Sequence, residues 1–109
     1  LKQWYSEKAQ LQFTKSLDHC WQNFKHLEIE KPKLSIKQMQ KRWGSLSSRG
    51  TITLNTNLIK APKECIDYVV THELCHLKHH NHSPDFYNLL SSIMPDWEKR
   101  KQKLELKMH

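Results

Sequence analysis

The stretch from residue 66 to 77 constrains the fold of this chain more than any other. It reads I-D-Y-V-V-T-H-E-L-C-H-L, and its apolar residues recur at three- and four-residue steps, as on the buried face of a helix. Because an α-helix repeats every 3.6 residues, His72 and His76 lie one turn apart on the same face. The sequence therefore predicts a helix that packs against a core and carries two histidines at the edge of its apolar stripe.

The residue types on this helix suit a metal site. Neutral imidazole is a good ligand for Zn²⁺. Glu73 is rotated by about 100° from its neighbour His72, so its carboxylate can reach a water at the metal without taking a ligand position. H-E-x-x-H is short enough to occur by chance among surface histidines, but the apolar stripe around it favours metal-assisted hydrolysis. We expect His72 and His76 to bind zinc and Glu73 to act as the base.

A third ligand should follow, because catalytic zinc usually has three protein ligands and one open position. We expect the metal helix to end at Asn81, since Asn tolerates the left-handed conformation that often ends a helix. Ser83 is a good N-cap for a second helix that begins at Pro84. His82 would then lie in the tight reversal between two helices, where it can fold back onto the metal.

Two further histidines, His79 and His80, are expected on the last turn of the metal helix. His80 continues the i, i+4 ladder from His76, but it lies another turn away. A metal held by His72 and His76 should therefore be beyond its reach. We interpret both side chains as a solvated helix end, where a partly protonated histidine also suits the helix dipole.

The same residues carry a resemblance to a known family. Residues 66–77, followed by Asn81-His82-Ser83, Phe86-Tyr87 and Met94-Pro95-Asp96-Trp97, resemble the YgjP-like metallopeptidases, small zincin-like proteins related to the SprT group. Arg42-Trp43-Gly44-Ser45-Leu46-Ser47, with Gly50, Ile52 and Leu54-Asn55, is similar to the R-W-G-S-C-S block of that family and its following strand. The match runs from about Lys33 to Lys103. Leu46 stands where the family usually has Cys, which argues against an essential thiol there.

The resemblance implies one zinc ion per chain, held by His72, His76 and His82, with Glu73 as catalytic base. It also implies a peptide or protein substrate that lies extended along an edge strand beside the metal helix. Such binding needs unpaired backbone groups and little side-chain specificity. We assign this role to the strand that contains Thr51, Ile52, Thr53 and Leu54.

Two further residues are candidates for stabilising the oxyanion of the reaction. Tyr87 and Arg42 can each donate a hydrogen bond to a developing negative charge. They are chosen on their chemistry alone, because no spacing relates either of them to the H-E-x-x-H helix. Both are therefore candidates, and the structure tests whether either lies near the H-E-x-x-H helix.

The rest of the chain predicts an α+β fold, and the resemblance implies that this fold is a zincin-like minimal metallopeptidase domain. Residues 2–27 show the three- and four-residue steps of an amphipathic helix. Residues 34–39 and 51–55 alternate apolar and polar side chains, which predicts two strands of a hairpin. The metal helix should start at Pro62, a further helix should span 84–93, and a last one should run from Pro95 to near Met108.

Length and cysteine usage narrow the class of protein. A chain of 109 residues is expected to form one domain, and Leu1 suggests an excerpt that lacks the β-rich segment usual upstream in the family. No run approaches the roughly 18 apolar residues of a membrane span, and no secretory leader is visible. Three cysteines without framework spacing suit a reducing compartment. We therefore expect a cytoplasmic protein with no membrane contact.

The charge leaves a second class of function open. A net charge of +7 permits weak, sequence-independent DNA contact. The rival reading is a basic module that binds nucleic acid or protein and in which zinc is only structural. The charges are spread over both ends of the chain without a nucleic-acid motif, and a structural zinc site needs no base such as Glu73. The residues therefore favour the enzyme.

Overall fold

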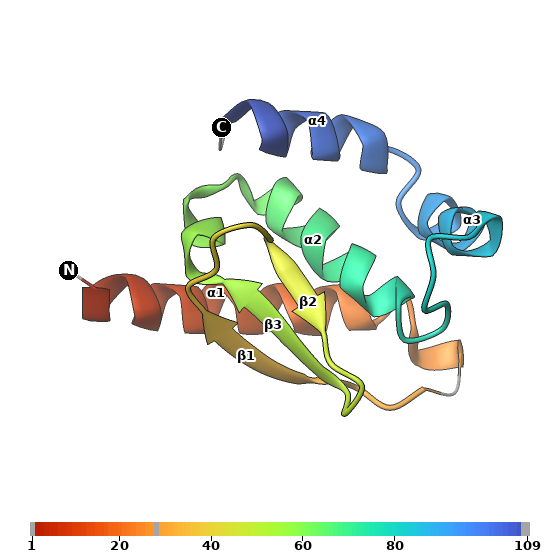
Figure 1. Cartoon of the computed structure of the whole chain (residues 1–109), viewed down its shortest axis with the longest axis horizontal. Coiled ribbons are helices and arrows are strands. Elements are labelled where there is room, and N and C mark those ends of the chain that lie inside the picture. Colours follow the sequence, from red (N-terminus) through yellow and green to blue (C-terminus); the bar gives the residue numbers. More distant parts are fainter. Residues whose placement is uncertain (1, 28, 108–109) are drawn as a thin grey trace.

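The fold is built around α2 (Lys63–Cys75), of which ten of 13 residues are buried. A computed structural model describes residues 2–27 and 29–107 of the chain. The remaining elements are α1 (Lys2–Trp21), β1 (Lys33–Lys37), β2 (Gly44–Leu46), β3 (Thr51–Asn55), α3 (Pro84–Ile93) and α4 (Trp97–Lys107), with 3₁₀ turns η1 (Lys25–Leu27) and η2 (Thr56–Lys60). α2 contacts α1, α3, α4 and β2. Figure 1 shows α1 behind the sheet and α2, and α4 along the other side of α2.

The predicted α+β class is confirmed, with an N-terminal helix, a small sheet, the helix that carries H-E-x-x-H and two C-terminal helices. The apolar stripe predicted for residues 2–27 is buried as expected from its spacing, including Phe13 of α1 and Phe24 just after it, which are fully inaccessible. Leu104 places α4 against the same core. Met108, the predicted end of the last helix, lies outside the described residues. No helix in the described part of the chain is both long and apolar enough to cross a membrane.

The sheet differs from the predicted hairpin. Its strand order is β1-β3-β2, and β1 pairs with β3 in parallel, with Lys33 opposite Thr51. A parallel pair cannot be joined by a tight turn, so the strands predicted at 34–39 and 51–55 do not form a hairpin with each other. The hairpin joins β2 to β3 instead, through a turn that Gly50 closes at φ 81°. The short segment before this turn, β2, for which no strand was predicted, is the partner of β3 in that hairpin.

This topology corrects the predicted substrate strand. Thr51, Ile52, Thr53 and Leu54 form the centre of the sheet, paired with β1 on one side and β2 on the other. Their backbone groups are therefore already used, and Ile52 and Leu54 are fully buried. The prediction that they form an open edge is wrong. The edge beside α2 is β2, because α2 contacts β2 more extensively than β3.

The ends of two helices also differ from expectation. α1 ends at Trp21 instead of continuing to Leu27. α2 ends at Cys75, with His76 as its C-cap, and not at Asn81. The chain leaves α2 through successive i→i+3 hydrogen bonds, such as Leu77 N–H to the Leu74 carbonyl at 3.0 Å, which tighten the last turn. His79 and His80 therefore lie beyond the helix.

α3 follows its prediction closely. It spans Pro84–Ile93, and the Ser83 hydroxyl accepts the Phe86 amide at 3.4 Å, as an N-cap does. α4 begins at Trp97, two residues after the predicted Pro95. The short reversal between α2 and α3 is thus held at both ends by local hydrogen bonds.

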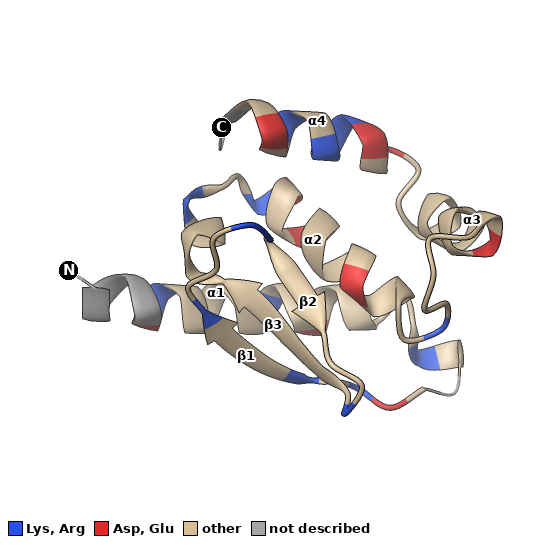
Figure 2. Cartoon of the chain, viewed as in Figure 1, with Lys and Arg blue, Asp and Glu red and all other residues tan. Residues whose placement is uncertain are grey.

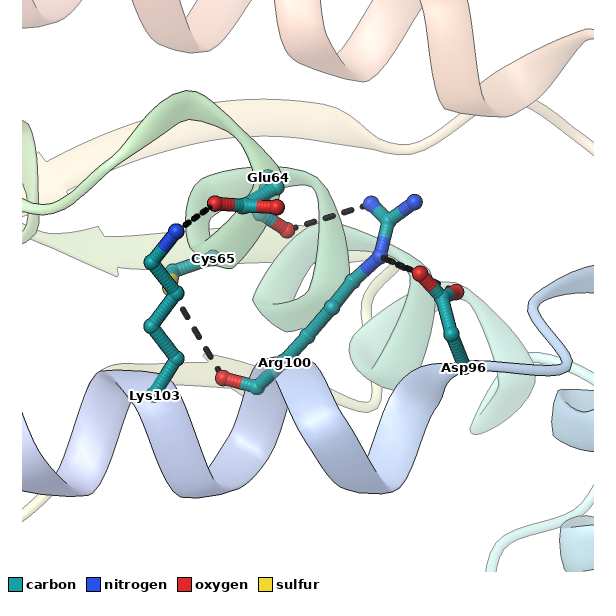
Figure 3. A network of polar contacts seen from close by, with 5 residues as sticks. All are labelled: Glu64, Cys65, Asp96, Arg100 and Lys103. Atoms are coloured by element: carbon teal, nitrogen blue, oxygen red, sulfur yellow. Dashed lines mark hydrogen bonds and ion pairs between the residues drawn. The ribbon is translucent and has the colours of Figure 1, made fainter.

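A polar network joins α4 to the start of α2 (Figure 3). The Arg100 side chain donates to Asp96 at 3.1 Å and to the Glu64 carbonyl at 3.2 Å. Lys103 forms an ion pair with the Glu64 carboxylate, and the Cys65 thiol lies 3.6 Å from the Arg100 carbonyl. α4 is therefore fixed alongside α2, where it forms one wall of the site.

Candidate metal centre

Three histidines converge where α2 meets the reversal that follows it. Donor atoms of His72, His76 and His82 all lie within 4.8 Å of one another. The ring centroids are 5.1 Å apart for His72 and His76, 5.3 Å for His72 and His82, and 4.8 Å for His76 and His82. The first two are positioned by the pitch of α2. His82 is brought back toward them by the reversal between α2 and α3, which ends at Ser83, the N-cap of α3.

Phe86 supports all three rings. Its centroid lies 5.1 Å from that of His72, 4.6 Å from His76 and 5.0 Å from His82, and its side chain is fully buried. It comes from α3, one turn after His82. In the sequence, Phe86 stood out only through the resemblance, although its i+4 spacing from His82 was a usable signal. An aromatic ring at this place limits the orientations of the three imidazoles.

Hydrogen bonds to two imidazoles favour one tautomer. His76 Nδ1 lies 3.2 Å from the His79 carbonyl oxygen, and His72 Nδ1 lies 3.2 Å from Glu73 Oε2. When Nδ1 donates in these contacts, Nε2 is left free as a ligand. Burial lowers the pKa of His76, which favours the neutral form that binds metals. His79 thus contributes through its backbone, and its imidazole is not among the converging donors.

The donor set fits zinc. Zinc–nitrogen bonds of about 2.0–2.1 Å put the ligand atoms of one tetrahedral ion about 3.4 Å apart, so the widest donor pair must close by on the order of 1 Å. His82 is exposed and can make this movement by side-chain rotation. Cys75 does not complete a fourth position, because it is fully buried and burial raises the pKa of its thiol to about 12. Among the described residues the cluster therefore has three donors and one open side.

Glu73 lies beside this set on α2, and only 7% of its surface is exposed. At the level of Glu73, β2 passes close to α2 at Gly44. A Cβ atom at Gly44 would lie 3.4 Å from Glu73 Cγ and 3.0 Å from Val69 Cγ1. The missing side chain therefore allows the edge strand to approach the carboxylate closely.

Two hollows meet at these residues. The larger, of about 850 Å³, extends along β2 toward the hairpin turn, and the smaller, of about 240 Å³, lies between β2 and α4. Both are lined by Arg42, Gly44, His72 and Glu73. Together they form one cleft that follows the edge strand past the histidines and will be called the β2 cleft.

The structure brings only some of the other candidate residues to the β2 cleft. Arg42 lines both parts of the β2 cleft. His80 lines the larger part, although it is not among the converging donors. Tyr87 lines neither part, and its ring stacks on that of Trp97 at 5.5 Å. Thr51–Leu54 belong to β3, the central strand, which lies next to β2 on the side away from its open edge.

Tyr68 also lies at the site, although it was not predicted from the sequence. It precedes His72 by one turn, lines the smaller part of the β2 cleft, and has its ring 5.9 Å from that of His72. Burial raises the pKa of its hydroxyl to about 12, so it remains a neutral hydrogen-bond donor at physiological pH. Its i−4 spacing from His72 was the available signal.

Comparisons with known proteins identify the family and the fold. The sequence profile described as YgjP-like, metallopeptidase domain, matches residues 1–107. The fold is similar to that in the crystal structure of the metallopeptidase zymogen of Pyrococcus abyssi abylysin, with a TM-score of 0.73, 25% identity, and coverage of 88% of this chain and 91% of that chain. It is also similar to the metallopeptidase zymogen of Methanocaldococcus jannaschii jannalysin, with a TM-score of 0.73, 22% identity, and coverage of 89% and 97%. No curated protein matches this chain.

Proposed function

Since this chain belongs to the YgjP-like family of metallopeptidase domains, we propose that it hydrolyses peptide bonds with one zinc ion held by His72, His76 and His82. One observation carries the proposal. Three imidazole donors lie within 4.8 Å of one another, and a nearly buried carboxylate, Glu73, lies beside them at the floor of an open cleft. A purely structural site would need a fourth protein ligand and no such carboxylate.

The roles of the side chains follow from their protonation chemistry. A bound zinc ion would lower the pKa of water toward neutrality and polarise the scissile carbonyl. Glu73 accepts the proton of the attacking water and passes it to the nitrogen of the leaving amine. Its burial and its position over Gly44 hold the carboxylate at the floor of the β2 cleft. Phe86 and the His79 carbonyl keep the imidazoles oriented.

The substrate backbone is proposed to bind along β2. This strand is an edge of the sheet, so one side of its backbone is available to pair with an extended peptide. Gly44 brings the paired peptide next to Glu73. Backbone pairing supplies affinity with little dependence on sequence, so the substrate class is an extended segment of peptide or protein.

Arg42 is the better supported of the two oxyanion candidates. Its side chain is exposed and lines both parts of the β2 cleft, whereas Tyr87 lies outside both and is engaged with Trp97. Tyr68, a neutral donor at the same cleft, is the alternative that the geometry adds. Either could donate a hydrogen bond to the developing oxyanion.

The test is zinc content together with peptide cleavage in a set of histidine variants. Alanine at position 72, 76 or 82 should abolish or greatly weaken zinc binding and cleavage, because each removes one of three donors. His80→Ala is the matched control, since it removes an imidazole from the same cleft that is not in the converging set. If His82→Ala keeps full zinc affinity while His80→Ala loses it, the proposed ligand set is wrong.

A further inference from the structure

The β2 cleft continues past the histidines into a third hollow. Its larger part shares Gly50 and Leu77 with a hollow of about 300 Å³. The charged residues that line this third hollow are Glu30, Lys31, Lys33 and Arg49. Because the larger part of the β2 cleft is also lined by His76, the extension adjoins the same hollow that contains the metal centre. It will be called the basic extension.

The backbone holds the basic extension in place. Lys33 opens β1, and its amide donates to the Gly50 carbonyl at 3.0 Å. The β2–β3 turn is closed by Gly50 N–H to the Ser47 carbonyl at 3.0 Å and by Ser47 N–H to the Thr51 carbonyl at 2.9 Å. Figure 2 shows basic positions at the hairpin tip and at the start of β1, at the same end of the sheet. These backbone hydrogen bonds therefore hold Lys33 and Arg49 near each other at this end of the sheet.

These two cations differ from Lys31 in their ion pairing within the described part of the chain. Within residues 2–27 and 29–107, neither Lys33 nor Arg49 forms an ion pair with an Asp or Glu. Lys31 differs, because it pairs with Asp18. Among the described residues that line the basic extension, Glu30 is the one carboxylate. A surplus of positive charge therefore remains at this end of the groove.

The opposite end of the groove is balanced. The smaller part of the β2 cleft, against α4, contains Lys101 and Glu105 together. Arg42 and Glu73 are common to both parts and do not distinguish the two ends. A charged substrate would therefore meet a net positive field on one side of the metal centre only.

The direction of a bound peptide follows from the edge strand. Antiparallel pairs are slightly more stable and more common than parallel ones. β2 runs from Gly44, beside Glu73, toward the hairpin turn, so an antiparallel peptide would have its N-terminal residues at the basic extension. At about 3.3 Å per residue, the turn is reached about three to five residues from the scissile bond.

We propose that the enzyme selects peptides with Asp or Glu about three to five residues on the N-terminal side of the bond it cleaves, bound by Lys33 and Arg49. This rests on the proposed peptidase function and names its substrate class. Each exposed ion pair changes a binding constant by up to about fivefold. The Asp peptide should therefore exceed the Lys peptide by about five- to twentyfold in kcat/KM, and high salt should reduce the difference.

The experiment starts from cleavage sites found without assumptions. The zinc-loaded wild type digests a mixed peptide library, and mass spectrometry gives the cleaved bonds. The best substrate is then synthesised with Asp, Asn or Lys at the upstream positions, and kcat/KM is measured for each. The wild type should prefer Asp, then Asn, then Lys. In Lys33→Glu/Arg49→Glu this order should reverse.

The matched control is Lys15→Glu/Lys99→Glu. It makes the same change in net charge at exposed positions of α1 and α4 that line none of the three hollows, and it should keep the wild-type order. A second readout needs no turnover. The fluorescence anisotropy of labelled Asp and Lys peptides on zinc-loaded Glu73→Gln should show the same order at low salt.

Three outcomes overturn the inference. They are equal kcat/KM and binding for the Asp and Lys peptides, a preference confined to the C-terminal side of the bond, and retention of the wild-type order by Lys33→Glu/Arg49→Glu. A single-stranded oligonucleotide that binds through Lys33 and Arg49, without any peptide preference, would assign the basic extension to nucleic acid and also refute it. Absence of cleavage of every peptide by the zinc-loaded wild type refutes the proposed function instead, and the binding arm then still tests the charge preference.

Discussion

Gly44→Ala tests the claim that β2 must lie directly against the metal helix. The new Cβ would be 3.0 Å from Val69 Cγ1, 3.2 Å from Leu54 Cδ2 and 3.4 Å from Glu73 Cγ. Val69 and Leu54 are buried, so neither can move freely away. Overpacking of this kind costs about 1–3 kcal/mol, which corresponds to a loss of roughly 5–20 °C in Tm for a chain of this size.

The activity should fall by more than the stability change explains. The third contact pushes on the side chain that carries the proposed base, while no histidine atom is among the three nearest to the methyl group. We therefore expect Gly44→Ala to bind zinc as the wild type does and to lose peptide cleavage at temperatures where it is fully folded. Zinc content, thermal melting and kcat/KM on one preparation measure this.

The companion variant is Val69→Ala, which removes the nearest contact. The Gly44→Ala/Val69→Ala double variant should be about 1 kcal/mol more stable than the sum of the two single effects, as neighbouring sites usually couple by this order. Additive effects would refute the argument that the strand and helix are in contact at this point. Wild-type activity in Gly44→Ala would refute its link to Glu73.

Three more outcomes are expected. Phe86→Leu should remain folded and bind zinc about tenfold more weakly, because the three imidazoles lose their shared aromatic support; unchanged affinity in a zinc titration would contradict this. Cys75, with a thiol pKa raised to about 12 by burial, should resist alkylation in the native protein and react only on unfolding, as mass spectrometry would report. Since Lys103 lowers the pKa of Glu64, their pair should stabilise the fold above the ordinary Glu pKa of 4.5 and lose this effect as the pH falls through the lowered value. The difference in Tm between wild type and Glu64→Gln should therefore disappear in acid.

Local signals predicted the helical part of this fold well. Ser83 and Pro84 give the start of α3 directly, because an N-cap and a first-turn proline act within a few residues. The end of α2 was missed, since Asn81 offered a plausible stop but the helix closes earlier through i→i+3 bonds at His76. The convergence of His72, His76 and His82 was nevertheless predicted, because either ending leaves His82 in the reversal.

The sheet and the surroundings of the site were harder to predict. Strand pairing is non-local, and nothing in the 34–39 or 51–55 segments alone distinguishes a parallel pair from a hairpin. β2 was not predicted, because it is only three residues long and the Gly and Ser residues around Leu46 are typical of turns. Phe86 and Tyr68 lay at helical spacing from the histidines, but their contacts depend on how α3 and the cleft are assembled.

The central claim is that Glu73 handles a proton and does not hold the metal or the fold. Glu73→Gln keeps the shape of the side chain and removes its ability to accept a proton. The decisive measurement is zinc content, Tm and peptide cleavage rate of this variant beside the wild type. We predict unchanged zinc, a similar Tm and a cleavage rate lower by about 10² to 10⁴. Equal cleavage rates would contradict the proposed mechanism, and loss of zinc or of the folded state would show that Glu73 is structural.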